Sequence, residues 1–438
     1  MSLLQVCSYW RTILLDYSKA WSNVHLKGQD MEFLAWQMSL SRNAPLDVTV
    51  HFHDYIFNTG HLAHRYFRES AEAIRESGRR VRSVSVRTAR SDHFQDFFGF
   101  ELPNLEELAW ENTGFGRPTH LLDAQVWDPN LYPKLRCLLI KGNLAWPMQS
   151  ITGLTRFRLE GPMIVTVTAI CNFLRRNETL ESIELVNLGV PLPVREETKC
   201  VELHNLTSLS FHDVAHGHLF PFIHIPVLMD LSIRPLEHQL RWSPNVWCSL
   251  SLPVGITSLE VEYLGCEGSL DQVRITGYND TQTHSLYLVE HSPSERLDPM
   301  LSALAQTPLH SITSISFDEK STNDPRYQLS CASLRMVFKN LPNLRRADLC
   351  WGHFTHGIVG QLGFDCPELE VLRVKTTRLT CPATFGLVLR MAKSRAELGM
   401  RLSRIECVVA EGRNAGETRE AWDTLARNAG LERYLCDE

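Results

Sequence analysis

The hexapeptide LESIEL at residues 180–185 shows the pattern that decides the fold of this chain. Its residues follow the frame L-x-x-L-x-L, whose last positions alternate between apolar and polar, as in a strand with one buried face. Other clear copies are LEELAW at 105–110, LTSLSF at 206–211 and LEVLRV at 369–374. The frame recurs thirteen times and begins at Val81, Leu105, Leu135, Leu154, Leu180, Leu206, Leu228, Ile256, Thr283, Ile312, Leu344, Leu369 and Leu402.

The spacing of these frames, about 27 residues on average, is typical of leucine-rich repeats, which run from roughly 20 to 29 residues. Each unit of such an array contributes one short strand to a parallel sheet, and its inward leucines are buried only by stacking on the next unit. Helical patterns precede some frames, as at residues 167–177 and 331–341. The sequence therefore predicts an α/β fold, a leucine-rich-repeat solenoid with a curved parallel sheet and with helices and loops on its outer side.

Three segments are expected along the chain. Residues 1–50 form a short helical segment, residues 51–412 an irregular repeat solenoid, and residues 413–438 a C-terminal helix. The pattern in 414–430 places apolar side chains on one side of that helix, which would cap the last open repeat.

Composition and charge exclude several classes of protein. The 438 residues are 44% hydrophobic and contain no apolar run near the roughly 18 residues that a membrane span needs. The net charge of −6 comes without basic runs, so no surface for nucleic acid is predicted. Twelve cysteines without a CxxC pair, and a start without a secretory signal, favour a cytoplasmic or nuclear protein with reduced thiols.

No catalytic signature occurs in the sequence. It has no phosphate-binding loop, no nucleophile elbow, no HExxH and no glycine-rich dinucleotide loop. His212, His216 and His218 are the most tempting metal ligands, but Gly217 between them disfavours a helix, and solvated loop histidines are the simpler interpretation. We expect no enzyme activity, no cofactor and no metal.

Binding remains as the expected role. The outward residues of the strands, the x of L-x-L, line one face of the sheet. Trp110, Tyr263 and Trp351 lie near strand ends and are further candidates, because aromatic residues are frequent in interface hot spots. The alternative is a solvated strand face without a partner. The residues predicted to form a partner-binding face are Arg158, Glu184, Glu260, Tyr287, Asp348 and Arg373.

The start of the chain resembles a known family. VCSYWRTILLDYSKAWSNVHL at residues 6–26 is similar to the second half of an F-box, in the form common in mushroom-type fungi. LAWQMSLSRNAPLDVTV at 34–50 is similar to the segment that follows there. The chain thus resembles F-box and leucine-rich-repeat proteins. The family's opening Leu-Pro element and first helix would lie before Met1.

The resemblance implies a substrate-recruiting subunit of a cullin-type ubiquitin ligase. Its F-box would join a Skp-type adaptor, while the repeats hold a target protein. Two alternatives stay open: residues 3–26 simply cap the first repeat, or the chain is a stand-alone protein-binding scaffold with no ubiquitin role. By resemblance, the adaptor-binding residues are Leu3, Leu4 and Cys7, and the F-box core consists of Val6, Trp10, Ile13, Leu14 and Trp21.

Overall fold

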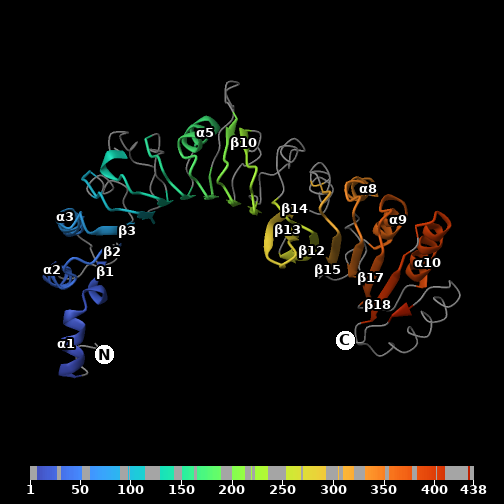
Figure 1. Ribbon diagram of the computed structural model, residues 1–438, viewed down its shortest axis with the longest axis horizontal. Helices are drawn as coiled ribbons and strands as arrows, with labels where there is room; N and C mark the ends of the chain where they lie inside the picture. Colours follow the sequence, from blue (N-terminus) through green and yellow to red (C-terminus); the bar gives the residue numbers. More distant parts are fainter. Residues whose placement is uncertain are drawn as a thin grey trace. The chain divides into compact units, whose positions relative to one another are not determined.

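The structure is a computed structural model in which the chain forms two compact units, Met1–Leu206 (unit 1) and Thr207–Glu438 (unit 2). Each unit contains a run of mostly parallel strands with helices (Figure 1). The structure describes residues 7–26, 31–51, 60–88, 97, 99–113, 129–142, 150–161, 165–188, 200–212, 219, 222–234, 253–267, 270–292, 304, 309–319, 331–350, 355–376, 382–400, 402–409 and 433–434.

In unit 1 each strand from β1 to β7 pairs with the next one in parallel. The strands are β1 Asn23–Leu26, β2 Leu46–His51, β3 Val81–Thr88, β4 Glu107–Asn112, β5 Cys137–Lys141, β6 Arg156–Glu160 and β7 Ser182–Val186, with a short β8 at Val201–Glu202. The helices are α1 Ser8–Asp16, η2 Ser18–Trp21, α2 Met31–Leu40, α3 Gly60–Glu76, η5 Pro129–Leu131 and α5 Val167–Arg176. Strands β1 and β2 belong to the expected N-terminal segment, so that segment supplies the first two strands of this ladder.

The core of unit 1 is built from in-register apolar rows. Leu108, Leu138, Phe157 and Ile183 are register neighbours on successive strands and are all buried. Helix α5 adds Phe173, whose ring centroid lies 4.5 Å from that of Phe157. Thr166 caps this helix by accepting a hydrogen bond from the backbone N–H of Ala169, as expected for an N-cap threonine. The inward leucines of the frames are therefore buried by stacking on neighbouring strands.

Asn177 joins two repeats inside unit 1. Its side chain is fully buried. The amide oxygen accepts a hydrogen bond from the N–H of Leu154 at 3.1 Å. The amide nitrogen donates to the carbonyls of Ile151 at 2.9 Å and Phe173 at 3.0 Å. One side chain thus satisfies three buried backbone groups from both the loop before β6 and helix α5.

In unit 2 two parallel runs flank an antiparallel insertion. Strands β9, β11 and β14 pair in parallel, and so do β12, β15, β16, β17, β18 and β19. The strands are β9 Ser208–His212, β10 Ile223–His224, β11 Asp230–Arg234, β12 Ser258–Glu267, β13 Leu270–Tyr278, β14 His284–Ser292, β15 Ser314–Glu319, β16 Arg346–Cys350, β17 Val371–Thr376, β18 Arg404–Val409 and β19 Arg433–Tyr434.

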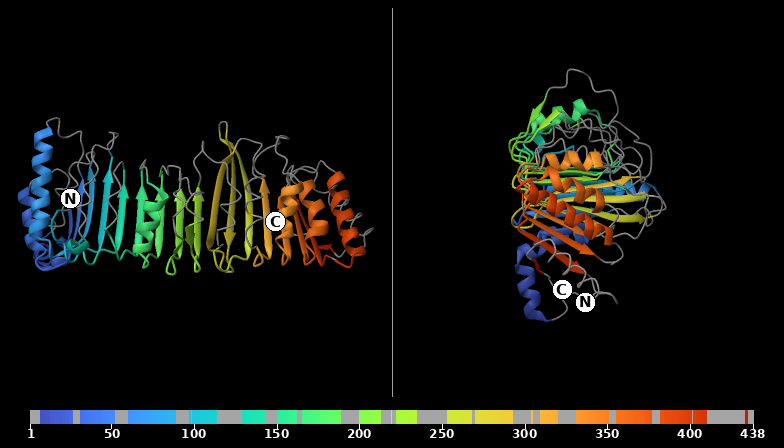
Figure 2. Two further views of the ribbon diagram at one scale, coloured as in Figure 1. Left: turned by 90° about the horizontal axis from the view of Figure 1, so that it is seen from above. Right: turned by 90° about the vertical axis from the view of Figure 1, so that its right-hand side faces the viewer.

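The prediction that consecutive strands are parallel is wrong for this part of the chain. Strand β13 pairs antiparallel with both β12 and β14, so the spatial order is β11-β14-β13-β12-β15. The sequence did not reveal β13, because its stretch LDQVRITGY lacks the recurring frame. We call β12, β13 and β14 the insert. Its strands have 10, 9 and 9 residues, whereas β11 has 5 and β15 has 6, and they extend beyond their neighbours (yellow in Figure 2, left).

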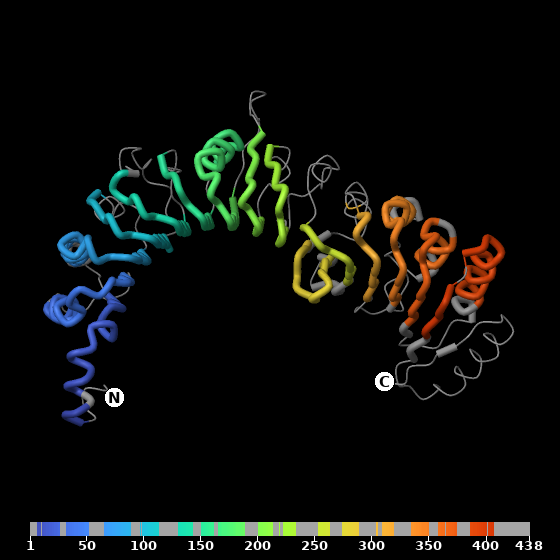
Figure 3. The backbone as a smooth tube through the Cα atoms, in the orientation of Figure 1, coloured from blue at the N-terminus to red at the C-terminus, as the bar shows by residue number. Residues whose placement is uncertain are grey.

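Three helices lie along one side of β15–β18 in unit 2 (Figure 3): α8 Cys331–Lys339, α9 Thr355–Asp365 and α10 Pro382–Glu397. Helix α9 packs against both α8 and α10.

Arg395 of α10 is completely buried and donates hydrogen bonds to four backbone carbonyls around the end of α9. The acceptors are Leu362 (2.9 Å), Cys366 (2.7 Å), Pro367 (3.1 Å) and Leu369 (3.1 Å). Burial lowers the pKa of this guanidinium from its ordinary value.

Two further expectations concern the C-terminus and membranes. The predicted capping helix at 414–430 lies outside the described residues, and the described part of the tail is β19, which pairs in parallel with β18. Among the helices that the structure describes, none is long and apolar enough to cross a membrane.

Candidate binding face

The outward face of unit 1 carries charged side chains in register on neighbouring strands. Arg87, Glu111, Lys141 and Glu160 are register partners from β3 to β6. Arg87 Nε lies 3.5 Å from Glu111 Oε2. Lys141 Nζ lies 3.7 Å from Glu111 Oε1 and 2.9 Å from Glu160 Oε1. Positive and negative groups therefore alternate across four strands.

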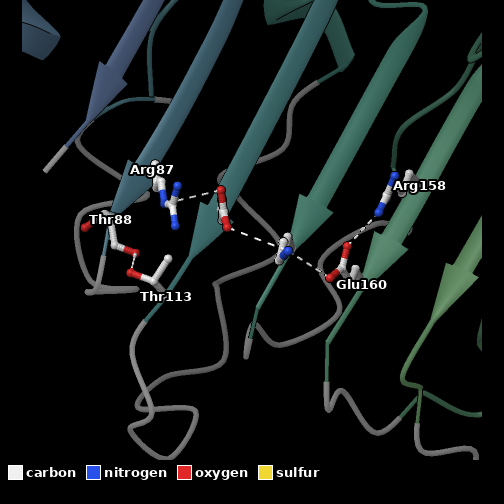
Figure 4. A network of polar contacts seen from close by, with 7 residues as sticks. Arg87, Thr88, Thr113, Arg158 and Glu160 are labelled. Atoms are coloured by element: carbon white, nitrogen blue, oxygen red, sulfur yellow. Dashed lines mark hydrogen bonds and ion pairs between the residues drawn. The ribbon is translucent and has the colours of Figure 1, made fainter. Parts of the chain in front are cut away.

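The same network continues through two residues predicted for the face. Arg158 contacts Glu160 at 2.9 Å, which Figure 4 shows, and Glu184 at 3.1 Å. Partial burial raises the pKa of the Glu160 carboxyl, but the hydrogen bonds from Lys141 and Arg158 outweigh it, so that pKa lies below its ordinary value. Arg158 and Glu184 thus come together as an ion pair between β6 and β7.

In unit 2 the strand register places nine outward residues in one row. Glu260, Tyr287, Asp348 and Arg373, the other residues predicted for the face, all belong to it and are partly exposed. Asp348 and Arg373 are direct register neighbours on β16 and β17. The complete row is Ser210, Ser232, Tyr287, Thr276, Glu260, Ser316, Asp348, Arg373 and Glu406.

Neighbouring side chains hold two of these residues in place on the insert. The Tyr278 hydroxyl donates to Glu260 Oε2 at 2.5 Å. Burial, together with the adjacent Glu260 and Glu262 carboxylates, raises the pKa of Tyr278 to about 12, so the phenol stays protonated and remains a donor. The Arg274 guanidinium lies 5.4 Å from the centroid of the Tyr287 ring, within the range of a cation–π contact.

At the other end of the row, Glu406 lies between two arginines. Its carboxylate is 3.7 Å from Arg373 Nε and 2.8 Å from Arg404 Nε. Asp348 forms an ion pair with Arg346 at 2.9 Å. The pairing of Arg373 with Glu406 was not predicted, because it depends on the register between β17 and β18. Arg346 and Arg404 lie two residues before their partners on the same strand, and only the side-chain conformations decide those contacts.

Two sets of candidate residues lie elsewhere. Trp110 is fully buried on the inward side of β4, so it is core and cannot be a contact residue on the face. The side chains of Tyr263 and Trp351 are outside the described part.

The structure describes one of the three histidines considered as metal ligands. His212 contacts Ser210 at 3.0 Å and Ser232 at 3.2 Å on the face, while His216 and His218 are outside the described residues. Among the side chains that the structure describes, no group of three His, Cys, Asp or Glu could hold a metal ion.

The N-terminal residues form a small aromatic cluster on η2 and α2. The indole nitrogen of Trp21 donates to the carbonyl of Leu14 at 2.6 Å, and its ring packs edge-on against Trp36 at 5.2 Å. Ile13, expected in the F-box core, is instead 39% exposed, because α1 packs chiefly against η2 and leaves this side uncovered. Cys7 is exposed. Leu3, Leu4 and Val6 lie outside the described residues, as does the side chain of Trp10.

Comparisons with known proteins add little to this description. No protein-family model matches the chain, and no curated protein matches it. A solved structure, the crystal structure of the TLR13–ssRNA13 complex, matches with 12% sequence identity and a TM-score of 0.31. The match covers 81% of this chain and 45% of the TLR13 chain, so the chain spans less than half the length of that protein. The fold assignment therefore rests on the strand pairing and the recurring frame.

Proposed function

We propose that the chain is a leucine-rich-repeat-type scaffold that binds a partner protein on the outward face of its strands. The observation that carries this proposal is the row of polar and charged side chains that the strand register aligns on each unit, joined by Tyr287 in unit 2. Neighbours fix these side chains, as Glu160 fixes Arg158 and Tyr278 fixes Glu260. A face whose contact groups are already ordered loses little conformational entropy when it binds.

Photo-crosslinking from this face tests the proposal. A benzophenone amino acid in place of Ser316, on the face of β15, is expected to crosslink a partner protein. The same amino acid in place of Met336, an exposed residue of α8, serves as the control. Binding of the purified partner to the purified chain then confirms the contact. Equal crosslinking from both positions, or from Met336 alone, would refute the face as the binding surface.

A finer proposal is that the chain recruits a substrate to a cullin-type ubiquitin ligase through its F-box-like start. Exposed aromatic and apolar side chains on and just after the first helix favour this role. Tyr9 and Ile13 lie four residues apart on one side of α1, Tyr17 follows directly after the helix, and all three are exposed. Exposed apolar patches of this kind mark interaction sites. A Skp-type adaptor is the partner that the resemblance implies.

Replacing Ile13 with aspartate tests the finer proposal. Because Ile13 is exposed, the substitution should leave the thermal midpoint of unfolding unchanged but reduce co-purification with a Skp-type adaptor at least tenfold. Leu398→Asp is the matched control, since Leu398 is an apolar residue of unit 2 that is 58% exposed. If the unaltered chain does not bind the adaptor, the scaffold without a ubiquitin role is the function that stands.

A further inference from the structure

Three carboxylates gather on the outward face where the insert meets β15. Glu260 and Glu262 are alternate residues of β12, so both point outward. Glu262 is the register neighbour of Asp318 on β15, as Glu260 is of Ser316. From strand geometry, Glu260 and Glu262 lie roughly 7 Å apart, Glu262 and Asp318 roughly 5 Å apart, and Glu260 and Asp318 roughly 8 Å apart.

The cations on this surface do not balance its acids. Glu262 pairs with Arg274 at 3.2 Å. Glu260 receives only the neutral hydroxyl of Tyr278 from the described residues. Asp318 receives no hydrogen bond or ion pair from any residue that the structure describes. A surface with two uncompensated carboxylates is electrostatically complementary to a basic partner.

The face of unit 1 offers a contrast within the same chain. Three carboxylates of its charged network each contact at least one cation: Glu111 contacts Arg87 and Lys141, Glu160 contacts Lys141 and Arg158, and Glu184 contacts Arg158. Arginine and lysine side chains are thus interleaved with these carboxylates, whereas Glu260 and Asp318 have no such cation among the described residues.

Arg274 shows how this surface holds a guanidinium. The group lies between the Tyr287 ring, at 5.4 Å, and the Glu262 carboxylate, at 3.2 Å. Glu262 itself is only 6% exposed, so it is held in place before any partner arrives. Glu260 and Asp318 lie beside this ion pair on the same face and can accept the basic side chains of a partner.

We propose that the outward face of β12–β15 docks a basic segment of the partner protein, an inference that rests on the proposed function. Two Lys or Arg side chains of that segment pair with Glu260 and Asp318. Alternate residues of an extended segment lie about 7 Å apart, which is near the separation of these two carboxylates. Because the surface is acidic, it repels phosphate, so nucleic acid is not the occupant.

Fluorescence anisotropy with synthetic peptides tests this proposal. The probe is a labelled decapeptide of alternating Lys and Ser, and the comparison peptide alternates Glu and Ser. We expect the Lys peptide to bind, with an affinity that falls as salt is added, and the Glu peptide not to bind. The double variant Glu260→Gln/Asp318→Asn should weaken binding of the Lys peptide about five- to tenfold. The amide oxygen introduced by Glu260→Gln still accepts the hydrogen bond from Tyr278, so the thermal midpoint should not change.

The control variant Glu368→Gln/Glu370→Gln removes the same charge from two exposed residues just before β17. It should alter the affinity less than twofold. Failure of the Lys peptide to bind overturns the proposal, and so does equal weakening by both variants, which would indicate attraction by the net charge of −6 alone. A partner crosslinked at Ser316 that binds through a segment without basic residues would overturn this inference and leave the scaffold function standing.

Discussion

Replacing Arg395 with methionine is expected to lower the free energy of unfolding of unit 2 by about 4 kcal/mol. Methionine fills part of the same volume but donates no hydrogen bond. It would leave the carbonyls of Leu362, Cys366, Pro367 and Leu369 without their shared donor. Each buried carbonyl that loses its partner costs about 1–3 kcal/mol, less where water enters. The loss should be concentrated where α9 meets α10.

Urea unfolding combined with hydrogen exchange by mass spectrometry measures this effect. Exchange in residues 355–369 should accelerate before the rest of the chain unfolds. Lys393→Met is the matched control, because Lys393 is exposed on the same helix two residues away, and its change should stay within about 0.5 kcal/mol. A loss below about 1 kcal/mol for Arg395→Met would mean that water replaces the guanidinium and that the arginine does not lock the two helices.

Replacing Asn177 with leucine is expected to destabilise unit 1 by about 3 kcal/mol. Leucine has nearly the same size, so the change removes three hydrogen bonds without opening a cavity. The N–H of Leu154 and the carbonyls of Ile151 and Phe173 would stay buried without these bonds. Because these groups belong to two repeats, the contact between α5 and the loop before β6 should loosen first.

The urea midpoint followed by circular dichroism measures this loss. Asn172→Leu is the comparison, since Asn172 is exposed on α5 and its side-chain oxygen accepts from Arg175 at 2.8 Å. That variant should lie within about 0.5 kcal/mol of the unaltered chain. If both asparagine variants lost the same stability, the effect would come from placing leucine in this helix and not from the buried hydrogen bonds.

Much of the strand framework could be predicted from the sequence. Each of the thirteen frames leads into a strand, from β3 to β18, because a buried side chain at every second position leaves a period of two that needs no knowledge of the neighbours. The helical patterns at 167–177 and 331–341 fall on α5 and α8, because their apolar residues recur with the 3.6-residue period of a helix.

The parts that escaped prediction depend on contacts between distant residues. Strand β13 pairs with strands of the insert and lacks the leucine frame. Asn177 belongs to the sequence NET, and nothing in the local sequence says that its side chain is buried between repeats. Arg395 resembles any basic residue in the last turn of a helix. Its role appears only when α10 lies beside the end of α9.

The residues of the candidate face could likewise be predicted only in part from the sequence. Alternation along each strand was enough to identify Arg158, Glu184 and Asp348 as outward residues. It could not identify their ion partners Glu160 and Arg346, because residues two apart on one strand form an ion pair only where their side-chain conformations bring the charges together. It also failed for Trp110, since position near a strand end does not say which side of the sheet the ring occupies.

The antiparallel insert limits how this chain can change in length. Both β12 and β14 run parallel to the strands outside them, so β13 is the one reversed strand between two matched edges. Deleting β12 or β14 alone would leave β13 antiparallel to a strand outside the insert, and deleting β13 alone would remove the hairpins that connect β12 to β14. Deleting two adjacent strands, as a hairpin, would bring matched edges together again. Evolution or engineering can therefore add or remove strands at this point in pairs, whereas an ordinary repeat elsewhere in the array is gained or lost one at a time.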